Sequence, residues 1–180
     1  MFIAKEKRKT NIAEYILYMW QVEDLIRAHQ FNIDLIETNL ISQYSKPSRI
    51  KNDIREWFAD LILMMHEEGI RQHGHLSFLR TLMNDLFDFH LRLINNGDEK
   101  HYHQLYLQAS QYINELKDKS GNRVTNDIET CMNALYGLLL LRLKKKEISK
   151  ETEVAMSTFS QLIALLSKKF LQAERGEREI

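Results

Sequence analysis

The sequence predicts an all-α protein, a single-domain bundle of six or seven helices with short connections. Apolar residues recur every three or four positions along most of the chain, which is the spacing of one face of an α-helix. The few glycines, six in number, and the single proline mostly fall between these periodic segments. They therefore separate helices more than they interrupt them. No segment shows the alternating pattern that is typical of a strand.

The first helix is predicted at residues 11–28. Asn11 and Glu14 have the spacing of a capping box, in which two side chains satisfy N–H groups at the start of a helix. Between residues 12 and 20 only Glu14 is charged, so the helix is apolar nearly all round. We expect such a helix to be central to a bundle or buried in an oligomer.

Two further helices are predicted before residue 76. Asn32 can cap a short second helix that ends near residue 44. Pro47 suits the first turn of a third helix, where a missing N–H costs nothing. Gly69 and Gly74 bracket the end of this third helix.

The rest of the chain predicts four more helices. The fourth runs from about 76 to 95, and Asp98 can cap the fifth. Asn126 opens a second capping-box pattern at the start of the sixth, and Ser149 can cap the last, which ends near residue 173. The middle of the sixth helix, ALYGLLLLRL, is apolar on every side. We therefore expect it to be the most buried element.

The predicted domain spans residues 1–180, with a basic N-terminal arm at 1–10 and a charged tail at 174–180 that we expect to fray. Lysine plus arginine equals aspartate plus glutamate, at 25 each, so we expect neither nucleic acid nor a membrane as a partner. The single cysteine, Cys131, suits a reducing compartment. No stretch has the pattern of a signal peptide or a transmembrane helix. The expected location is the cytoplasm.

The stretch MMHEEGIRQHGHL, at residues 64–76, holds three histidines. Helical zinc sites use histidine pairs four residues apart, because those side chains meet on one face. His66 and His73 are seven residues apart and His73 and His75 are two apart, so none of these pairs fits. The stretch is better explained as a helix end followed by a turn. We expect Arg71 to bind a carboxylate and His75 to lie at the entry to the fourth helix, and we predict no metal and no cofactor.

Polar residues on otherwise apolar faces are the best candidates for a cleft or for the turn, although the same residues can be purely structural. A histidine on a core stripe, for example, is usually a satisfied core residue. The spacing of Asp53 with Glu56, and of Asp85 with Asp88, weakly resembles that of magnesium-binding helical nucleotide hydrolases. The candidates are Glu14, Trp20, Glu23, Asp24, Trp57, Asp60, Glu67, Glu68, Arg71, His75, Asp85 and His90.

Three blocks, NIAEYILYMWQVEDLIRA, MMHEEGIRQHGHL and ETCMNALYGLLLLRLKKKEIS, resemble landmarks of a protein family. This family is domain of unknown function 4924, a group of small helical bacterial proteins found in the Bacteroidetes. The resemblance covers nearly the whole chain and implies one compact helical domain, but it implies no activity and no catalytic residues. It also implies that residues 67–69, 71 and 74–76 belong to the family pattern, whereas His66 and His73 do not.

Two functions follow as hypotheses. The first is a binding or protein-interaction module without catalysis, with a homo-oligomer or another protein as its partner and a homodimer as one form. This hypothesis depends on the excess of apolar residues on the first and sixth helices. The alternative is a metal-dependent, hydrolase-like enzyme that uses acidic and histidine residues in an interhelical cleft. We favour the first, because no known reaction motif occurs in the chain.

Overall fold

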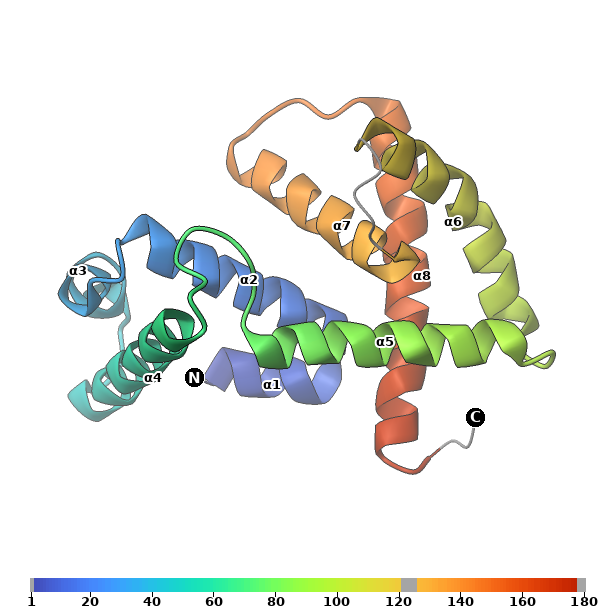
Figure 1. The fold of residues 1–180 in the computed structure, drawn as a ribbon. Helices are drawn as coiled ribbons and strands as arrows, with labels where there is room; N and C mark the ends of the chain where they lie inside the picture. The colour runs from blue at the N-terminus through green and yellow to red at the C-terminus, as the bar shows by residue number, and fades with distance from the viewer. Residues whose placement is uncertain (1, 121–125, 178–180) are drawn as a thin grey trace. The chain divides into compact units, whose positions relative to one another are not determined.

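The computed structural model describes residues 2–120 and 126–177. The residues in these two ranges form eight α-helices and one short 3₁₀ helix, and they form no strand (Figure 1). The predicted all-α class is confirmed. The helices are α1 (Phe2–Thr10), α2 (Ile12–Ala28), α3 (Ile33–Asn39), the 3₁₀ helix η1 (Ile41–Gln43), α4 (Ser48–Glu67), α5 (Ser77–Asn95), α6 (Lys100–Lys119), α7 (Asp127–Leu143) and α8 (Lys150–Glu174).

The chain divides into two compact units. The first unit consists of Met1–Lys9 and Glu14–Thr81, and the second consists of Thr10–Ala13 and Leu82–Ile180. Each unit is described by itself below. The expectation of a single domain over residues 1–180 stays a prediction.

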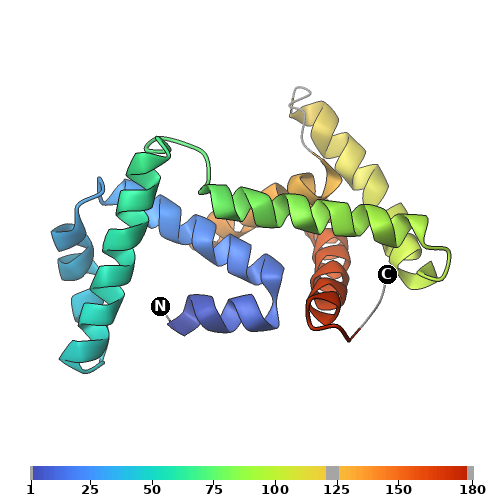
Figure 2. The ribbon, with the colours of Figure 1, turned by 60° about the horizontal axis from the view of Figure 1, so that its bottom comes forward.

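In the first unit, α3, η1 and α4 pack against one another (Figure 2). The inner face of α4 follows helical spacing, with Ile54, Phe58, Leu61 and Met65 all buried. The helix α2 is buried along most of its length, and Ile26 is 0% exposed. The expected burial of this helix is therefore confirmed, whereas its place at the centre of a bundle stays a prediction.

In the second unit, α6, α7 and α8 pack against one another in all three pairs (Figure 1). Helix α8 supplies the largest buried stripe, which includes Phe159, Leu162, Leu166 and Phe170. These positions are three or four residues apart, so they lie on one face of the helix. The same spacing places the buried residues of α6 on one face.

Three of the predicted helix caps are confirmed. The side chain of Asn32 accepts from the N–H groups of residues 34 and 35, that of Asn126 accepts from Glu129, and that of Ser149 accepts from residue 152.

The predicted cap at Asp98 is wrong. The N–H of Asp98 donates to the side chain of Asn96 at 3.1 Å, so Asp98 belongs to the preceding turn. The helix begins one residue after Glu99, which is buried and pairs with the ammonium group of Lys169 at 2.8 Å.

Two other expectations are corrected. Residues 1–10 were expected to form an arm, but Phe2–Thr10 is helix α1, because no glycine or proline interrupts it and Ala4 packs inward at 5% exposure. This helix raises the number above the predicted six or seven. The segment ALYGLLLLRL is not the most buried element, because within it only Leu138 is buried, whereas Leu141 is 41% and Leu143 is 66% exposed.

Two further predictions concern the C-terminal tail and membrane-spanning helices. The predicted tail at 174–180 begins at the last residue of α8, and its residues 178–180 lie outside the described part of the chain. Among the described helices, none combines the length and the apolar character needed to cross a bilayer.

Candidate functional site

An apolar groove lies in the first unit between α1 and the segment that leads into α4. It has a volume of about 650 Å³. Phe2 is 64% and Ile3 is 42% exposed beside it, and large apolar side chains exposed next to a groove are typical of a binding surface. The described residues that line the apolar groove are Phe2, Ile3, Tyr44, Lys46, Pro47, Ile50 and Ile54.

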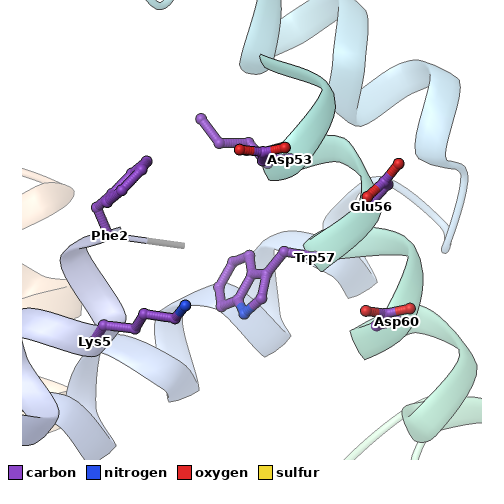
Figure 3. A pocket seen from close by; sticks show the side chains of 7 residues that line it. Phe2, Lys5, Asp53, Glu56, Trp57 and Asp60 are labelled. Carbon is purple, nitrogen blue, oxygen red and sulfur yellow. The ribbon is translucent and has the colours of Figure 1, made fainter. Parts of the chain in front are cut away.

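A second pocket, here called the acidic pocket, continues from the apolar groove, because both are lined by Phe2 and Ile54. It has a volume of about 330 Å³ and is also lined by Lys5, Asp53, Glu56, Trp57 and Asp60. In Figure 3 the indole ring of Trp57 extends from α4 toward Lys5 on α1. Three carboxylates, one ammonium group and one aromatic ring thus line the same pocket.

The acidic pocket follows from the two faces of α4. The apolar face of this helix is buried, and Asp53, Trp57 and Asp60 lie on an adjoining face at spacings of four and three residues. Glu56 completes the group. Within residues 2–120 and 126–177, these three carboxylates make no hydrogen bond or ion pair with a described residue. Their charges are therefore available to a ligand.

The stretch MMHEEGIRQHGHL forms the end of α4 and the turn into α5, and a buried carboxylate holds that turn. Glu23 on α2 is 0% exposed. Its carboxylate lies 2.5 Å from Nδ1 of His75 and accepts from the N–H of Leu76 at 2.8 Å. The ring of His75 stacks on Trp20, with ring centroids 4.4 Å apart. Glu23 thus satisfies an N–H at the start of α5 from outside that helix.

Arg27 holds the other side of the same turn. Its guanidinium group donates to the backbone carbonyls of Ile70 at 3.2 Å and Gly74 at 2.5 Å. It also pairs with Asp24 at 3.0 Å. Gly74 has φ of +94°, which is a left-handed conformation that favours glycine. The glycine allows the turn, and Arg27 then fixes its carbonyl groups.

Glu68 and Arg71 complete the turn. The carboxylate of Glu68 accepts from the N–H and the hydroxyl of Ser77, both at 2.7 Å, and so caps α5. We expected Arg71 to bind a carboxylate, and this is wrong. Arg71 lies 3.1 Å from Nε2 of His66 and 5.7 Å from the ring centroid of Phe31. The turn places Arg71 beside His66 and Phe31, whereas the nearby carboxylate of Glu68 already accepts the hydrogen bonds that cap α5.

The second unit contains a buried polar cluster around His90. His90 is 1% exposed, and its Nδ1 lies 2.6 Å from the hydroxyl of Tyr102. Burial lowers the pKa of His90 to about 4, against the opposing effect of Asp127. The histidine is therefore neutral near pH 7, and it can accept the hydroxyl hydrogen of Tyr102.

Asp127 anchors the edge of this cluster at the start of α7. It accepts from the hydroxyl of Tyr106 at 2.7 Å and pairs with Lys117 at 2.5 Å. Burial alone would raise the pKa of Asp127, but the hydrogen bonds from Lys117 and Tyr106 lower it. Burial raises the pKa of the Cys131 thiol well above its usual range. These groups have the pattern of a satisfied core network, and the buried thiol is a poor nucleophile.

Asp85 lines a different pocket of the second unit, with a volume of about 420 Å³. Asp88, Arg92 and Glu174 also line it, together with Phe89 and Phe170. The rings of Phe89 and Phe170 meet edge to face, with centroids 5.4 Å apart. Its lining carries three carboxylates and one guanidinium group, which is the same balance of charge as in the acidic pocket, so charge alone does not distinguish the two pockets.

The twelve candidate residues thus fall into several groups. Half of them meet at the turn after α4, while two line the acidic pocket and two lie in the second unit. Glu14 pairs with Lys7 at 2.6 Å, and Glu67 is exposed at the end of α4. At the turn are Trp20, Glu23, Asp24, Glu68, Arg71 and His75, in the acidic pocket Trp57 and Asp60, and in the second unit Asp85 and His90.

Sequence reasoning missed the apolar groove and the role of Arg27 at the turn after α4. Phe2, Ile3 and Lys5 were assigned to an arm, although residues 2–10 contain no glycine or proline and so permit the helix that forms there. The role of Arg27 was missed because nothing in its spacing indicates that it reaches carbonyl groups 43 and 47 residues away.

No group of three His, Cys, Asp or Glu side chains that could hold a metal ion occurs in the part of the chain that the structure describes. In comparisons with known proteins, residues 1–177 match a family described as Domain of unknown function (DUF4924). The chain belongs to this family. It matches no curated protein and no solved structure. The resemblance of the three sequence blocks to this family is confirmed.

Proposed function

We propose that this protein is a non-catalytic binding module whose apolar groove and acidic pocket together hold a basic amphipathic segment of a protein. One observation carries the proposal. A groove lined by apolar side chains continues into a pocket with three carboxylates that have no described partner. A helix or peptide with leucine-like side chains and lysine or arginine satisfies both surfaces at once.

The physical argument separates affinity from specificity. Burying Phe2, Ile3 and Ile50 under an apolar partner removes exposed apolar surface from water, which is the main favourable term. The carboxylates of Asp53 and Asp60 then favour basic partners over acidic ones, because a like charge placed there is repelled. Lys5 and Lys46 also line these surfaces, but the three carboxylates outnumber them. The preference for a basic partner therefore comes from the carboxylates.

The test uses the fluorescence of Trp57, which lines the acidic pocket. A designed helical peptide of leucine and lysine is titrated into the protein, beside a peptide in which glutamate replaces lysine. We expect a saturable change with the lysine peptide only, and no such change in Trp57→Phe. Trp20, the other tryptophan, is 2% exposed and serves as the constant background. An equal response to both peptides, or no response to either, contradicts the proposal.

A triple variant, Asp53→Asn, Glu56→Gln and Asp60→Asn, tests the role of charge. Each exposed ion pair contributes roughly 0.2–1 kcal/mol, so the loss of all three weakens binding by about tenfold. The matched control changes three acids outside both pockets: Glu67→Gln, Asp98→Asn and Asp118→Asn. It alters the net charge equally and should leave the affinity unchanged.

The second candidate function is the metal-dependent hydrolase-like enzyme, although among the described residues the three carboxylates of the acidic pocket do not form a group that could hold a metal ion by itself. Carboxylate oxygens are the ligands that magnesium prefers. Thermal unfolding of untagged protein with and without Mg²⁺, Mn²⁺ and Zn²⁺ tests it. A rise in Tm that disappears in the triple variant supports metal binding at these carboxylates, which the enzyme requires, and an unchanged Tm removes the metal-dependent enzyme.

A further inference from the structure

We infer that the segment held by the apolar groove and the acidic pocket is the end of α7 in a second copy of this chain. The inference rests on the proposed function and names the partner. It starts from the two halves of α7. The first half is buried in the second unit through Ile128, Cys131 and Met132, whereas the last turn emerges from that core.

The end of α7 exposes both leucines and basic groups. Leu141 is 41% and Leu143 is 66% exposed. Arg142 and the three lysines at 144–146 are exposed as well. A helix end with this composition has the chemistry that the groove and pocket require: apolar side chains for the groove, and cations for the three carboxylates.

The backbone at this helix end adds an independent observation. Lys145 has φ of +51°, and the N–H groups of Lys145 and Lys146 donate to the carbonyls of Arg142 and Leu141 at 3.0 Å each. This is the left-handed helix termination at which glycine is the usual residue. A lysine costs more there than a glycine does, and this lysine is one of the three consecutive exposed cations at 144–146.

A second copy offers the same two surfaces in return. If only one groove were filled, each contact would leave one groove and one helix end open, and the molecules would grow into chains. A reciprocal pair, in which each copy holds the α7 end of the other, closes as a dimer. The reciprocal pair, a homodimer, is the form that the experiment below tests.

The experiment exchanges charges between the two surfaces. One variant carries Asp53→Lys, Glu56→Lys and Asp60→Lys, and is called the basic-pocket variant. The other carries Lys144→Glu, Lys145→Glu and Lys146→Glu, and is called the acidic-end variant. A control carries Lys100→Glu, Lys119→Glu and Lys168→Glu. Mass is measured by light scattering and sedimentation over a hundredfold range of protein concentration, and circular dichroism checks that each variant is folded.

We expect the wild-type chain and the control to form dimers, and each charge-exchanged variant alone to be a monomer. An equimolar mixture of the two variants should form a dimer again, since every groove then meets a helix end of opposite charge. Leu143→Ser, at a mostly exposed position, provides a probe that leaves the charges unchanged, and it should weaken the dimer at least tenfold.

The outcomes separate this inference from the proposed function. A wild-type chain that is monomeric at every concentration but still binds the leucine–lysine peptide overturns the second copy and keeps the binding module. A dimer that persists in both charge-exchanged variants also overturns the inference, because association then uses another surface. A monomeric chain that fails to bind the peptide overturns both.

Discussion

The turn after α4 and the acidic pocket lie in the same unit and contain the same kinds of side chain, but they use their polar groups in opposite ways. At the turn, Glu23, Arg27 and Glu68 each bind backbone groups of residues 70–77. In the acidic pocket, the carboxylates of Asp53 and Asp60 have no hydrogen bond or ion pair to a described residue. Groups that are buried must be paired, because desolvation is costly, whereas exposed groups need no partner within the chain.

This difference changes which region is a candidate for function. The histidine-rich turn has the composition of a site, yet its polar residues stabilise the chain's own backbone. The pocket beside α1 has a plainer sequence, yet its charges and apolar side chains are open to a partner. Stability measurements should therefore distinguish the two regions.

The largest effect is expected at Glu23. Glu23→Ala removes the acceptor for His75 and for the N–H of Leu76, and the remaining groups stay buried or partly buried without it. We expect the free energy of unfolding to fall by about 3 kcal/mol or more. Urea unfolding measures this change. Glu67→Ala, on the exposed end of α4, is the control and should change stability by less than about 0.5 kcal/mol. Equal losses in the two variants would remove the contrast.

The next effect extends the comparison to the polar cluster of the second unit. Burial lowers the pKa of His90 to about 4, below the ordinary value of 6.5. Between these values the unfolded chain binds a proton at this histidine and the folded chain does not. The contribution of His90 is therefore fully present above pH 6.5 and is lost as the pH falls toward 4, by up to about 3 kcal/mol.

Urea unfolding at pH 7 and at pH 4.5 tests this expectation. His90→Asn should flatten the pH dependence in this window, whatever its effect on stability at pH 7. The exposed His101 supplies the control, His101→Asn, which should keep the wild-type slope. A slope that is the same in wild type and His90→Asn would mean that His90 titrates normally.

A smaller effect is expected at the end of α7. Lys145 has φ of +51°, and Lys145→Gly removes the steric strain that a side chain causes in this left-handed conformation. The change should raise the free energy of unfolding by roughly 0.5–1 kcal/mol. Lys144→Gly removes the same charge at φ of −82°, where glycine gives no such relief. Thermal unfolding at low protein concentration compares the two. If both variants gain equally, charge and not backbone conformation is responsible.

The smallest effect on stability is expected in the acidic pocket. The triple variant Asp53→Asn, Glu56→Gln and Asp60→Asn removes like charges that are three and four residues apart on α4. We expect stability to stay the same or to rise by less than about 0.5 kcal/mol. Urea unfolding gives this value. A loss of 1 kcal/mol or more would show that these carboxylates stabilise the fold, and the contrast with Glu23 would fail.

The sequence predicted the helices well because their signals are local. Apolar spacing located seven helices, and the caps at Asn32, Asn126 and Ser149 follow from side chains that reach N–H groups two or three residues away. It also selected Trp20, Glu23, Asp24 and His75, since a polar or aromatic residue within an apolar stretch needs a specific neighbour. It could not say who that neighbour was, because Glu23 and His75 are 52 residues apart.

By itself, then, the sequence determined the all-helical class, most helix boundaries and the membership in a family that spans residues 1–177. Only the tertiary structure decided which polar side chains bind other groups of the chain and which stay exposed to a partner. It turned the histidine-rich stretch into a clamped turn, and it brought α1 beside α4 to make a groove. The physical reason is that helix formation depends on neighbours in the chain, whereas burial and pairing depend on elements that meet only after folding.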